Sequence, residues 1–444
     1  MSCEASDVLA TCKNLLSVLL LALASSGHSQ AAADISDPVR LGIMQGFPPA
    51  ADKRVTTQNA FEFPNLRWAL RNARALTPTT DIRRAITPLP LAAGPSADFD
   101  RLRFTVAEQS LSLPEYLRQT FTDGFIVLHQ GKIVYERYLD SFSPEQPHIW
   151  ASMTKSVTGL LAAGLIAEGK LDPSAKLSVY VPELAGTPFG EATLQQNLDM
   201  QVEAVYPAHL PPDIGLFAAV GIVPQRPGMP DNIYGFLLAA SRPEQASATP
   251  IWYYQNGSPE AVAWAMRRVT GKSWSALVAE RIWSLFAEDD AYSQVDALGT
   301  EMASGGLSST LRDAARFAEA IRLAWSRPYQ TSAFTQAVQL ALLPNTSQAL
   351  IAHNPRAKER IGYAYRDYWY QKNDGDGSIE AAGRFGQRIY INPKRELVIV
   401  KMSSAPDMAP RATQAGAAPA SGSQPADTVA AFNSMVSALL PALP

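Results

Sequence analysis

IWASMTKSVTGLL, residues 149–161, places a serine, a threonine and a lysine directly before an apolar run. Apolar residues recur at helical spacing from Val157 to Leu165, so the pattern predicts a helix that begins near Ser152. Because residues three apart are neighbours on a helix, Ser152 and Lys155 would share one face. The segment is therefore either a solvated helix cap or a nucleophile beside its own base.

The chemistry that such a helix start allows favours the second interpretation. There, Ser152 gains unpaired backbone N–H groups and the positive end of the helix dipole. Its own N–H can stabilise the oxyanion that forms on an acyl group under attack. Lys155 acts as a base only when neutral, and desolvation by the apolar residues that follow would favour the neutral form. A Ser-x-x-Lys match arises easily by chance, however, so the motif alone does not decide.

A second motif lies about a hundred residues further on, in IWYYQNGSPEAVAW. Its Tyr254-Gln255-Asn256 would lie on a loop before a helix, where a phenol and an amide can face a Ser–Lys pair. The phenol can relay a proton to the leaving group, and the amide can hold the lysine and the substrate carbonyl. Tyr390–Asn392 fits the same pattern, but we interpret it as the end of a strand followed by a turn.

Composition excludes several classes of function. The 444 residues are 47% hydrophobic and 18% charged, with a formal net charge of -3. That balance provides no basic surface for nucleic acid and no polybasic membrane patch. The sequence contains no HExxH, HxHxD or paired CxxC motif, so neither a metal site nor a cofactor is expected. It also lacks the G-x-S-x-G motif of α/β-hydrolases.

The N-terminus resembles a targeting segment. The apolar run Leu15–Ser26 is too short to span a bilayer comfortably, and small residues follow it. We therefore expect residues 1–33 to be a secretory signal peptide and the mature protein to be periplasmic or secreted, without stable membrane insertion. Both cysteines, Cys3 and Cys12, lie in this segment, so the mature protein would contain no thiol or disulfide.

Strand patterns lie towards both ends of the chain. FIVLHQGKIVYERY, residues 125–138, contains two alternating runs joined at Gln130-Gly131, which predicts a hairpin. GRFGQRIYINPKRELVIVKMSS predicts strand, turn and strand, whereas SGGLSSTLRDAARFAEAIRLA predicts a Ser/Thr-capped amphipathic helix. We predict an α+β fold in which one antiparallel sheet, flanked by helices, is assembled from both ends of the chain.

The same patterns divide the chain into parts. Residues 34–100 are expected to form an extension that wraps the body. Residues 101–148 and 300–444 are expected to form the α/β sheet domain, with a flexible insert at 407–427. Residues 149–299 would be an inserted, mainly helical domain, and the cleft between the two domains would hold the site.

Several segments then carry a resemblance to a known family. FTDGFIVLHQGKIV, SMTKSVTG, YVPELAG, LDMQ, YQN, SGGLSSTLRDAARFA, RFGQRIYINP and VIVKMSS occur in this order. Together they resemble the serine β-lactamase-like superfamily, on its class C β-lactamase and esterase side, and most of all the 6-aminohexanoate-dimer hydrolase group. The resemblance covers residues 60–405. It implies a β-lactamase/transpeptidase-like fold, with Ser152 as nucleophile, Lys155 as its base partner, Tyr254 as proton relay and Asn256 as supporting amide.

The third motif of that superfamily departs from its pattern. Penicillin-recognising members carry Lys-Thr-Gly or His-x-Gly on the strand that faces the nucleophile. Here Ala381 to Gly383 occupy that place, and the resemblance implies the backbone N–H of Arg384 as second oxyanion donor. A shift in register would move this donor towards Gln387. The missing cation normally pairs with a substrate carboxylate, so its absence disfavours β-lactams and cell-wall peptides unless Arg384 replaces it.

Two further positions bear on the substrate. Leu210 stands where the 6-aminohexanoate-dimer hydrolase group has a tyrosine tied to amide selectivity. GLFAAVGIVP, residues 215–224, is more apolar than the equivalent segment of that group. We interpret this segment as either the wall of an acyl pocket or ordinary core between domains.

The motifs together predict a serine hydrolase that cleaves small-molecule esters or small amides through an acyl-enzyme. A β-lactamase or D-alanyl-D-alanine carboxypeptidase is the alternative within enzymes. An envelope-binding module without catalysis is the alternative from another class, and the presence of Ser152, Lys155 and Tyr254 together argues against it. The sequence does not determine the oligomeric state.

Overall fold

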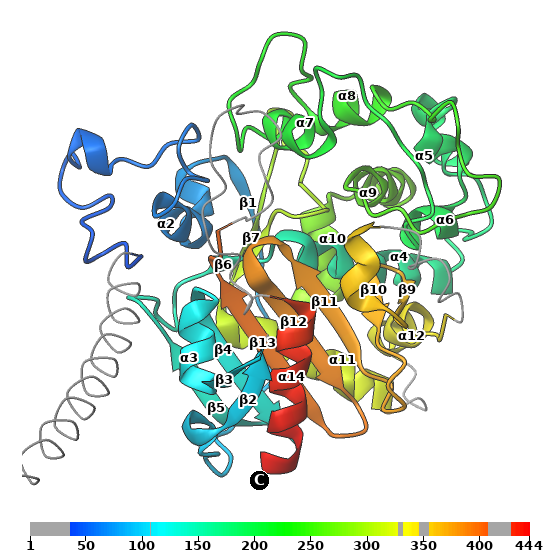
Figure 1. Ribbon diagram of the computed structural model, residues 1–444. Helices are drawn as coiled ribbons and strands as arrows, with labels where there is room; N and C mark the ends of the chain where they lie inside the picture. The colour runs from blue at the N-terminus through cyan, green and yellow to red at the C-terminus, as the bar shows by residue number, and fades with distance from the viewer. Residues whose placement is uncertain (1–35, 107, 327–331, 346–354, 407–427) are drawn as a thin grey trace, which may run out of the picture.

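The computed structural model describes residues 36–106, 108–326, 332–345, 355–406 and 428–444 (Figure 1). Its centre is a seven-stranded antiparallel sheet in the order β5-β4-β13-β12-β11-β10-β9. Its strands are β4 (Thr122–His129), β5 (Lys132–Tyr138), β9 (Ala364–Arg366), β10 (Trp369–Gln371), β11 (Ile379–Gly383), β12 (Gln387–Asn392) and β13 (Leu397–Ser403). One antiparallel sheet combined with many helices confirms the predicted α+β class.

The sheet is assembled from both ends of the chain, as predicted. β4 pairs with β5 on one side and with the C-terminal strand β13 on the other. Gln130 and Gly131 both have positive φ, as the two central residues of a type I′ turn require, so the predicted hairpin is confirmed. β12 and β13 form the second predicted hairpin, which places Tyr390 and Asn392 on a strand.

Helices cover both faces of the sheet. Successive side chains of β4 point to opposite faces, so Phe125 and Val127 pack in one core cluster and Ile126 and Leu128 in the other. In Figure 1, α14 lies in front of the sheet and α11 lies behind it. The helices of this part are α3 (Leu113–Gln119), α11 (Leu311–Ser326), α12 (Ala333–Ala341) and α14 (Val429–Leu439).

The middle of the sequence is mainly helical. Its helices are α4 (Thr154–Ala167), α5 (Pro188–Glu191), α6 (Leu194–Leu198), α7 (Pro212–Ala219), α8 (Ile233–Leu238), α9 (Gly257–Thr270) and α10 (Trp274–Arg281). α4 approaches the turn between β9 and β10 closely, because a Cβ at Gly159 would lie only 2.0 Å from the backbone oxygen of Asp367. Glycine therefore fixes how α4 rests on the edge of the sheet.

A smaller sheet connects the N-terminal region to the body. It runs in the order β1-β7-β8-β6, and β1 pairs antiparallel with β7. Its strands are β1 (Thr79–Ile82), β6 (His148–Ile149), β7 (Ala291–Gln294) and β8 (Leu307–Ser309), and a separate hairpin consists of β2 (Arg103–Val106) and β3 (Gln109–Ser112). Residues from the expected extension therefore complete a sheet with strands from the middle of the chain.

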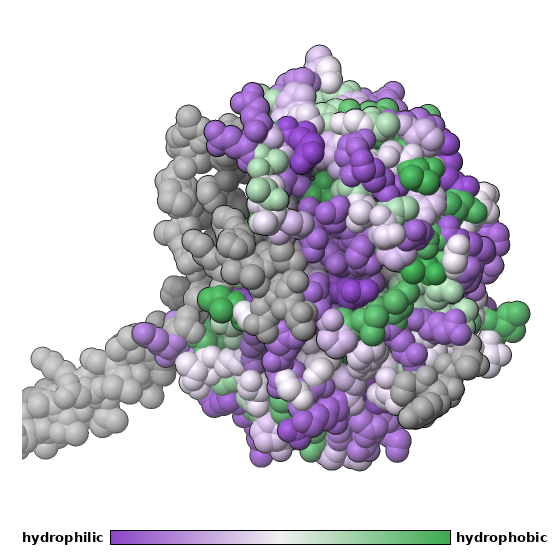
Figure 2. Space-filling view, turned by 90° about the vertical axis from the view of Figure 1, so that its right-hand side faces the viewer, coloured by the Kyte–Doolittle hydropathy of each residue, from purple (hydrophilic) through white to green (hydrophobic). Residues whose placement is uncertain are grey.

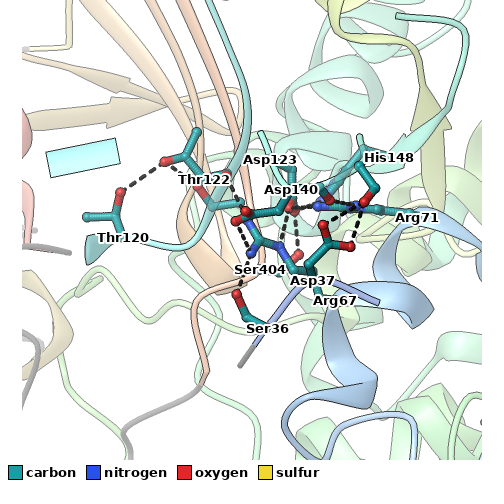
Figure 3. A network of polar contacts seen from close by, with 12 residues as sticks. Ser36, Asp37, Arg67, Arg71, Thr120, Thr122, Asp123, Asp140, His148 and Ser404 are labelled. Carbon is teal, nitrogen blue, oxygen red and sulfur yellow. Dashed lines mark hydrogen bonds and ion pairs between the residues drawn. The ribbon is translucent and has the colours of Figure 1, made fainter. Parts of the chain in front are cut away.

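A buried ionic cluster holds helix α2 (Asn65–Arg71) against the main sheet (Figure 3). Arg67 Nε donates to Asp123 Oδ1 at 2.6 Å, and Arg71 Nη2 donates to the same oxygen. His148 Nε2 and the Ser404 hydroxyl contact the other oxygen, Oδ2. Burial alone would raise the pKa of Asp123, but Arg71 and Arg67 lower that pKa well below its usual range.

The same cluster reaches the start of the described chain. Arg67 Nη1 donates to the Ser36 hydroxyl and to Asp140 Oδ2, and its Nη2 donates to the backbone oxygen of Thr122. With the bond to Asp123, one arginine from α2 holds four partners. The N-terminal region is therefore docked by buried charge as well as by strand pairing.

Hydrophobic side chains are scattered among hydrophilic ones on the face drawn in Figure 2. Within the described ranges, no helix combines the length and apolarity that crossing a membrane requires. The expected signal peptide, residues 1–33, and the expected flexible insert, residues 407–427, lie outside the described residues.

Candidate active site

Ser152 lies in a short turn, Ala151–Met153, that leads directly into α4. The turn is anchored by Trp150, whose backbone N–H donates to Leu307 O at 2.8 Å and whose Nε1 donates to Ser309 Oγ at 2.8 Å. Ala151 has a φ of +46°, a conformation that costs a non-glycine residue about 1 kcal/mol and that occurs often at functional sites. The fold thus holds Ser152 in one place at some local cost.

Lys155 is buried beside this serine. Its Nζ lies 2.8 Å from Ser152 Oγ, which is within the reach needed for proton transfer. The same Nζ donates to Asn256 Oδ1 at 2.7 Å and to the backbone oxygen of Ser304 at 2.8 Å. The lysine is 1% exposed. The predicted Ser–Lys pair and the predicted amide therefore meet at one buried nitrogen.

Tyr254 and Asn256 lie at the end of the loop before α9, where the sequence places them. Lys155 Nζ lies 5.2 Å from the ring centroid of Tyr254, so the phenol is beside the Ser–Lys pair. Asn256 Nδ2 donates to Asp213 Oδ1 at 2.9 Å. This second bond fixes the orientation of the amide, with its oxygen towards the lysine and its nitrogen towards the carboxylate.

Two acidic residues that the sequence did not indicate support the site. Asp213, on α7, lines the same cavity as Ser152. Glu260, on α9, is fully buried and accepts the backbone N–H groups of Ala303 at 3.1 Å and Ser304 at 2.8 Å. Burial raises the pKa of Glu260. It holds the segment whose Ser304 oxygen accepts from Lys155.

Asp213 gives a direct test of this support. Asp213→Ala removes the acceptor that orients Asn256, so we expect kcat for an ester to fall about ten-fold, the value of one hydrogen bond to a charged group. Asp213→Asn keeps an acceptor oxygen and should retain most of the activity. Ile214→Ala, at the next and exposed position of the same helix, is the matched control. Equal losses in the Asn and Ala variants would contradict a positioning role; steady-state kinetics measures both.

The strand β11 brings the expected oxyanion donors to the same cavity. A Cβ at Gly383 would lie 2.5 Å from the backbone oxygen of Trp150, so only glycine allows β11 to end this close to the Ser152 turn. Ser152, Gly383 and Arg384 all line the cavity. Gln387 does not line it, and its side chain bonds at both ends to the backbone of Ser403. The geometry thus favours Arg384 over Gln387 as second donor.

The cavity has a volume of about 440 Å³ and is walled by three separate parts of the chain. Phe61 precedes α2 and stacks on Phe217 of α7 at 6.1 Å and on Phe385 at 6.0 Å between ring centroids. The guanidinium of Arg384 lies 5.8 Å from the Phe217 ring and 5.2 Å from the Phe385 ring. The N-terminal wall consists of Ala60, Phe61, Ala69, Leu70, Ala73, Leu76 and Thr77.

The two sequence positions tied to the substrate have different places. Phe217 and Ile222, from the segment at 215–224, line the cavity. Leu210 does not line it; this residue is 1% exposed and packs against Gly215, where a Cβ would lie 2.6 Å from it. In the part of the chain that the structure describes, no group of three His, Cys, Asp or Glu side chains is placed to hold a metal ion.

Comparison with known proteins adds independent evidence. The family described as beta-lactamase matches residues 116–422. The 6-aminohexanoate-dimer hydrolase of Paenarthrobacter ureafaciens is 30% identical over 366 residues, which cover 81% of this chain and 91% of the relative. A solved structure from Bacillus anthracis, provisionally assigned as a 6-aminohexanoate-dimer hydrolase, is 30% identical with a TM-score of 0.76 and covers 89% of this chain and 98% of its own.

A more distant structure shares the fold. A provisionally assigned β-lactamase from Bacteroides dorei is 14% identical with a TM-score of 0.52, over 74% of this chain and 97% of its own. The predicted β-lactamase-like fold is therefore confirmed, as is the predicted resemblance to 6-aminohexanoate-dimer hydrolases.

Proposed function

Because the chain belongs to the β-lactamase family, we propose that it is a serine hydrolase that cleaves esters or small amides through an acyl-enzyme. The observation that carries this proposal is the 2.8 Å contact between Ser152 Oγ and a buried Lys155 Nζ. Tyr254 and Asn256 beside that pair support it.

The proposed reaction has two halves. Ser152 Oγ attacks the carbonyl carbon while Lys155 takes the hydroxyl proton. The backbone N–H groups of Ser152 and Arg384 hold the tetrahedral oxyanion. Tyr254 passes a proton to the departing alcohol or amine, which leaves Ser152 acylated. Water then attacks the ester on Ser152 by the reverse sequence of proton transfers, which releases the acid and restores the serine.

The cavity wall narrows the proposed substrate class. Residues 381–383 supply no side-chain cation at the motif where penicillin-recognising relatives carry one. The wall of Phe61, Phe217 and Ile222 is apolar and suits an aliphatic acyl chain. Esters and linear amides therefore fit better than β-lactams, and the dimer of 6-aminohexanoate, named for two relatives, is the first amide to examine.

The proposal is tested on the wild-type protein with three substrates. p-Nitrophenyl butyrate should be hydrolysed, and mass spectrometry of the quenched reaction should find a butyryl group on the peptide that contains Ser152. The 6-aminohexanoate dimer tests amide cleavage, and nitrocefin tests the β-lactamase alternative. Ester turnover without an acylated Ser152 would contradict the mechanism, and nitrocefin hydrolysis faster than ester hydrolysis would favour the alternative.

We also propose that the protein acts outside the cytoplasm. The proposal rests on the apolar run and the small residues that follow it within residues 1–33. Fractionation of the producing cells, followed by N-terminal sequencing of the exported protein, tests it. A protein that stays in the cytoplasm with Met1 intact would contradict export.

A further inference from the structure

Two buried arginines line the cavity beyond the proposed catalytic residues. Arg360 ends the helical turn Pro355–Arg360, and Arg388 lies on β12. They are 9% and 8% exposed. Arg360 Nη2 donates to Glu380 Oε1 at 3.1 Å, and Arg388 Nη1 donates to the same oxygen. Glu380, on β11, is itself fully buried.

This arrangement leaves a positive excess. Two guanidinium groups share one carboxylate, and both lower the pKa of Glu380 although its burial would raise it. Lys372 also acts on Glu380, but it faces Asp374 as well. A buried charge without an opposite charge is costly unless a partner is supplied. The cavity wall at this point is therefore suited to receive an anion.

The hydrogen-bonding capacity of the wall is also unfilled. Among the described residues, Glu380 Oε2 has no partner, while Oε1 accepts both arginines, so neither arginine forms the two-bond fork that a carboxylate allows. Arg360 Nε and Trp252 Nε1 are buried donors without an acceptor in the same part of the chain. Both residues line the cavity. Buried donors of this kind are rare and call for an explanation, and a bound carboxylate would provide one.

Aromatic contacts place this wall next to the proposed proton relay. The guanidinium of Arg360 lies 4.1 Å from the ring centroid of Tyr370. The ring of Trp252 lies 6.2 Å from that of Tyr370 and 5.8 Å from that of Tyr254. Because Tyr254 is proposed to protonate the leaving group, the arginines lie on the leaving-group side of the site.

We infer that Arg360 and Arg388 form a carboxylate-binding subsite for the leaving-group half of the substrate. The inference rests on the proposed function, since it assigns the leaving-group side from Tyr254. The preferred substrates are then esters or amides whose alcohol or amine part carries a carboxylate. The positive charge absent from residues 381–383 is thus supplied from elsewhere in the same cavity.

The test compares two esters that differ in this one charge. One is the butyrate ester of 4-hydroxybenzoate, whose leaving group is anionic. The other is the butyrate ester of methyl 4-hydroxybenzoate, whose leaving group is neutral. We expect the wild type to favour the anionic ester through a lower KM. In Arg388→Gln, the ratio of kcat/KM for the anionic to the neutral ester should fall about ten-fold or more, the effect of losing a hydrogen bond to a charged group.

Three controls make the result decisive. Arg388→Lys keeps the charge and should restore part of the ratio. Arg312→Gln removes an arginine that pairs with Glu136 and does not line the cavity, so it should leave the ratio at the wild-type value. Should Arg388→Gln fail to fold, inhibition of the wild type replaces it: 4-hydroxybenzoate should inhibit hydrolysis of the neutral ester about ten-fold more strongly than 4-hydroxybenzamide, for the same reason.

The outcomes separate this inference from the function on which it rests. A wild type that hydrolyses both esters with equal kcat/KM, and that 4-hydroxybenzoate inhibits no better than the amide, overturns the subsite and leaves the hydrolase intact. A wild type that hydrolyses neither ester overturns both. A fall in both rates by the same factor in Arg388→Gln shows a structural role for the arginine and overturns the subsite as well.

Discussion

Ser152→Ala is expected to lower kcat for p-nitrophenyl butyrate by about 10³-fold or more, since losses of that size follow removal of a nucleophile in serine hydrolases. The reason is local. Ser152 Oγ lies 2.8 Å from Lys155 Nζ, and the same nitrogen is held in place by Asn256 and the Ser304 backbone. Lys155→Met keeps the volume but removes the base, and it should cost a similar factor.

The two substitutions act on one unit, which provides a sharper criterion than either alone. The double variant should be no slower than Ser152→Ala, because groups that act together are not additive. Ser156→Ala is the matched control: it removes a serine from the same helix whose hydroxyl donates to Tyr368 O at 2.8 Å. Its turnover should stay close to the wild-type value. If Ser152→Ala keeps a substantial part of wild-type turnover, another nucleophile is at work.

The second large effect concerns stability. Asp123→Asn leaves Arg67 and Arg71 buried without their shared carboxylate, and removal of one partner from a buried ion pair costs roughly 3–5 kcal/mol in the free energy of unfolding. Asp81→Asn is the matched control, since it breaks a half-exposed pair with Arg74 and should cost under about 1 kcal/mol. Urea unfolding measures both, and equal costs would contradict the role assigned to the cluster.

The same cluster predicts a pH dependence with a definite sign. The pKa of Asp123 is lower in the folded protein than in the unfolded chain, where it is about 3.9. Its contribution is therefore complete above that unfolded value and is lost as the pH falls below it towards the folded value. The difference in unfolding free energy between wild type and Asp123→Asn should be large near neutral pH and smaller at about pH 3.

Local sequence was enough to predict part of the site. Ser152 and Lys155 are one helical turn apart, so the period of the helix alone places them together. Asn256 carried a recognisable spacing from Tyr254. Asp213 lies 43 residues from Asn256 and had no such signal, because only the packing of α7 near the start of α9 brings it close.

The cavity walls were less accessible to sequence reasoning for the same reason. Arg360 and Arg388 meet through Glu380, and each comes from a different element of the sheet region. The extension was expected to wrap the body, but nothing in its sequence placed Phe61 against Phe217 and Phe385. Strands, hairpins and capped helices follow from local pattern, whereas a wall built from three distant segments does not.

The wall at residues 60–77 has a practical meaning for anyone who wants to alter what this enzyme accepts. It stands before the match to the family, which begins at residue 116, and it contains none of the groups proposed to break bonds. A mutant library confined to those codons would remodel the chamber around the acyl chain while leaving the reaction machinery untouched. Conversely, a gene trimmed to begin at the family boundary would encode an enzyme with one side of that chamber missing.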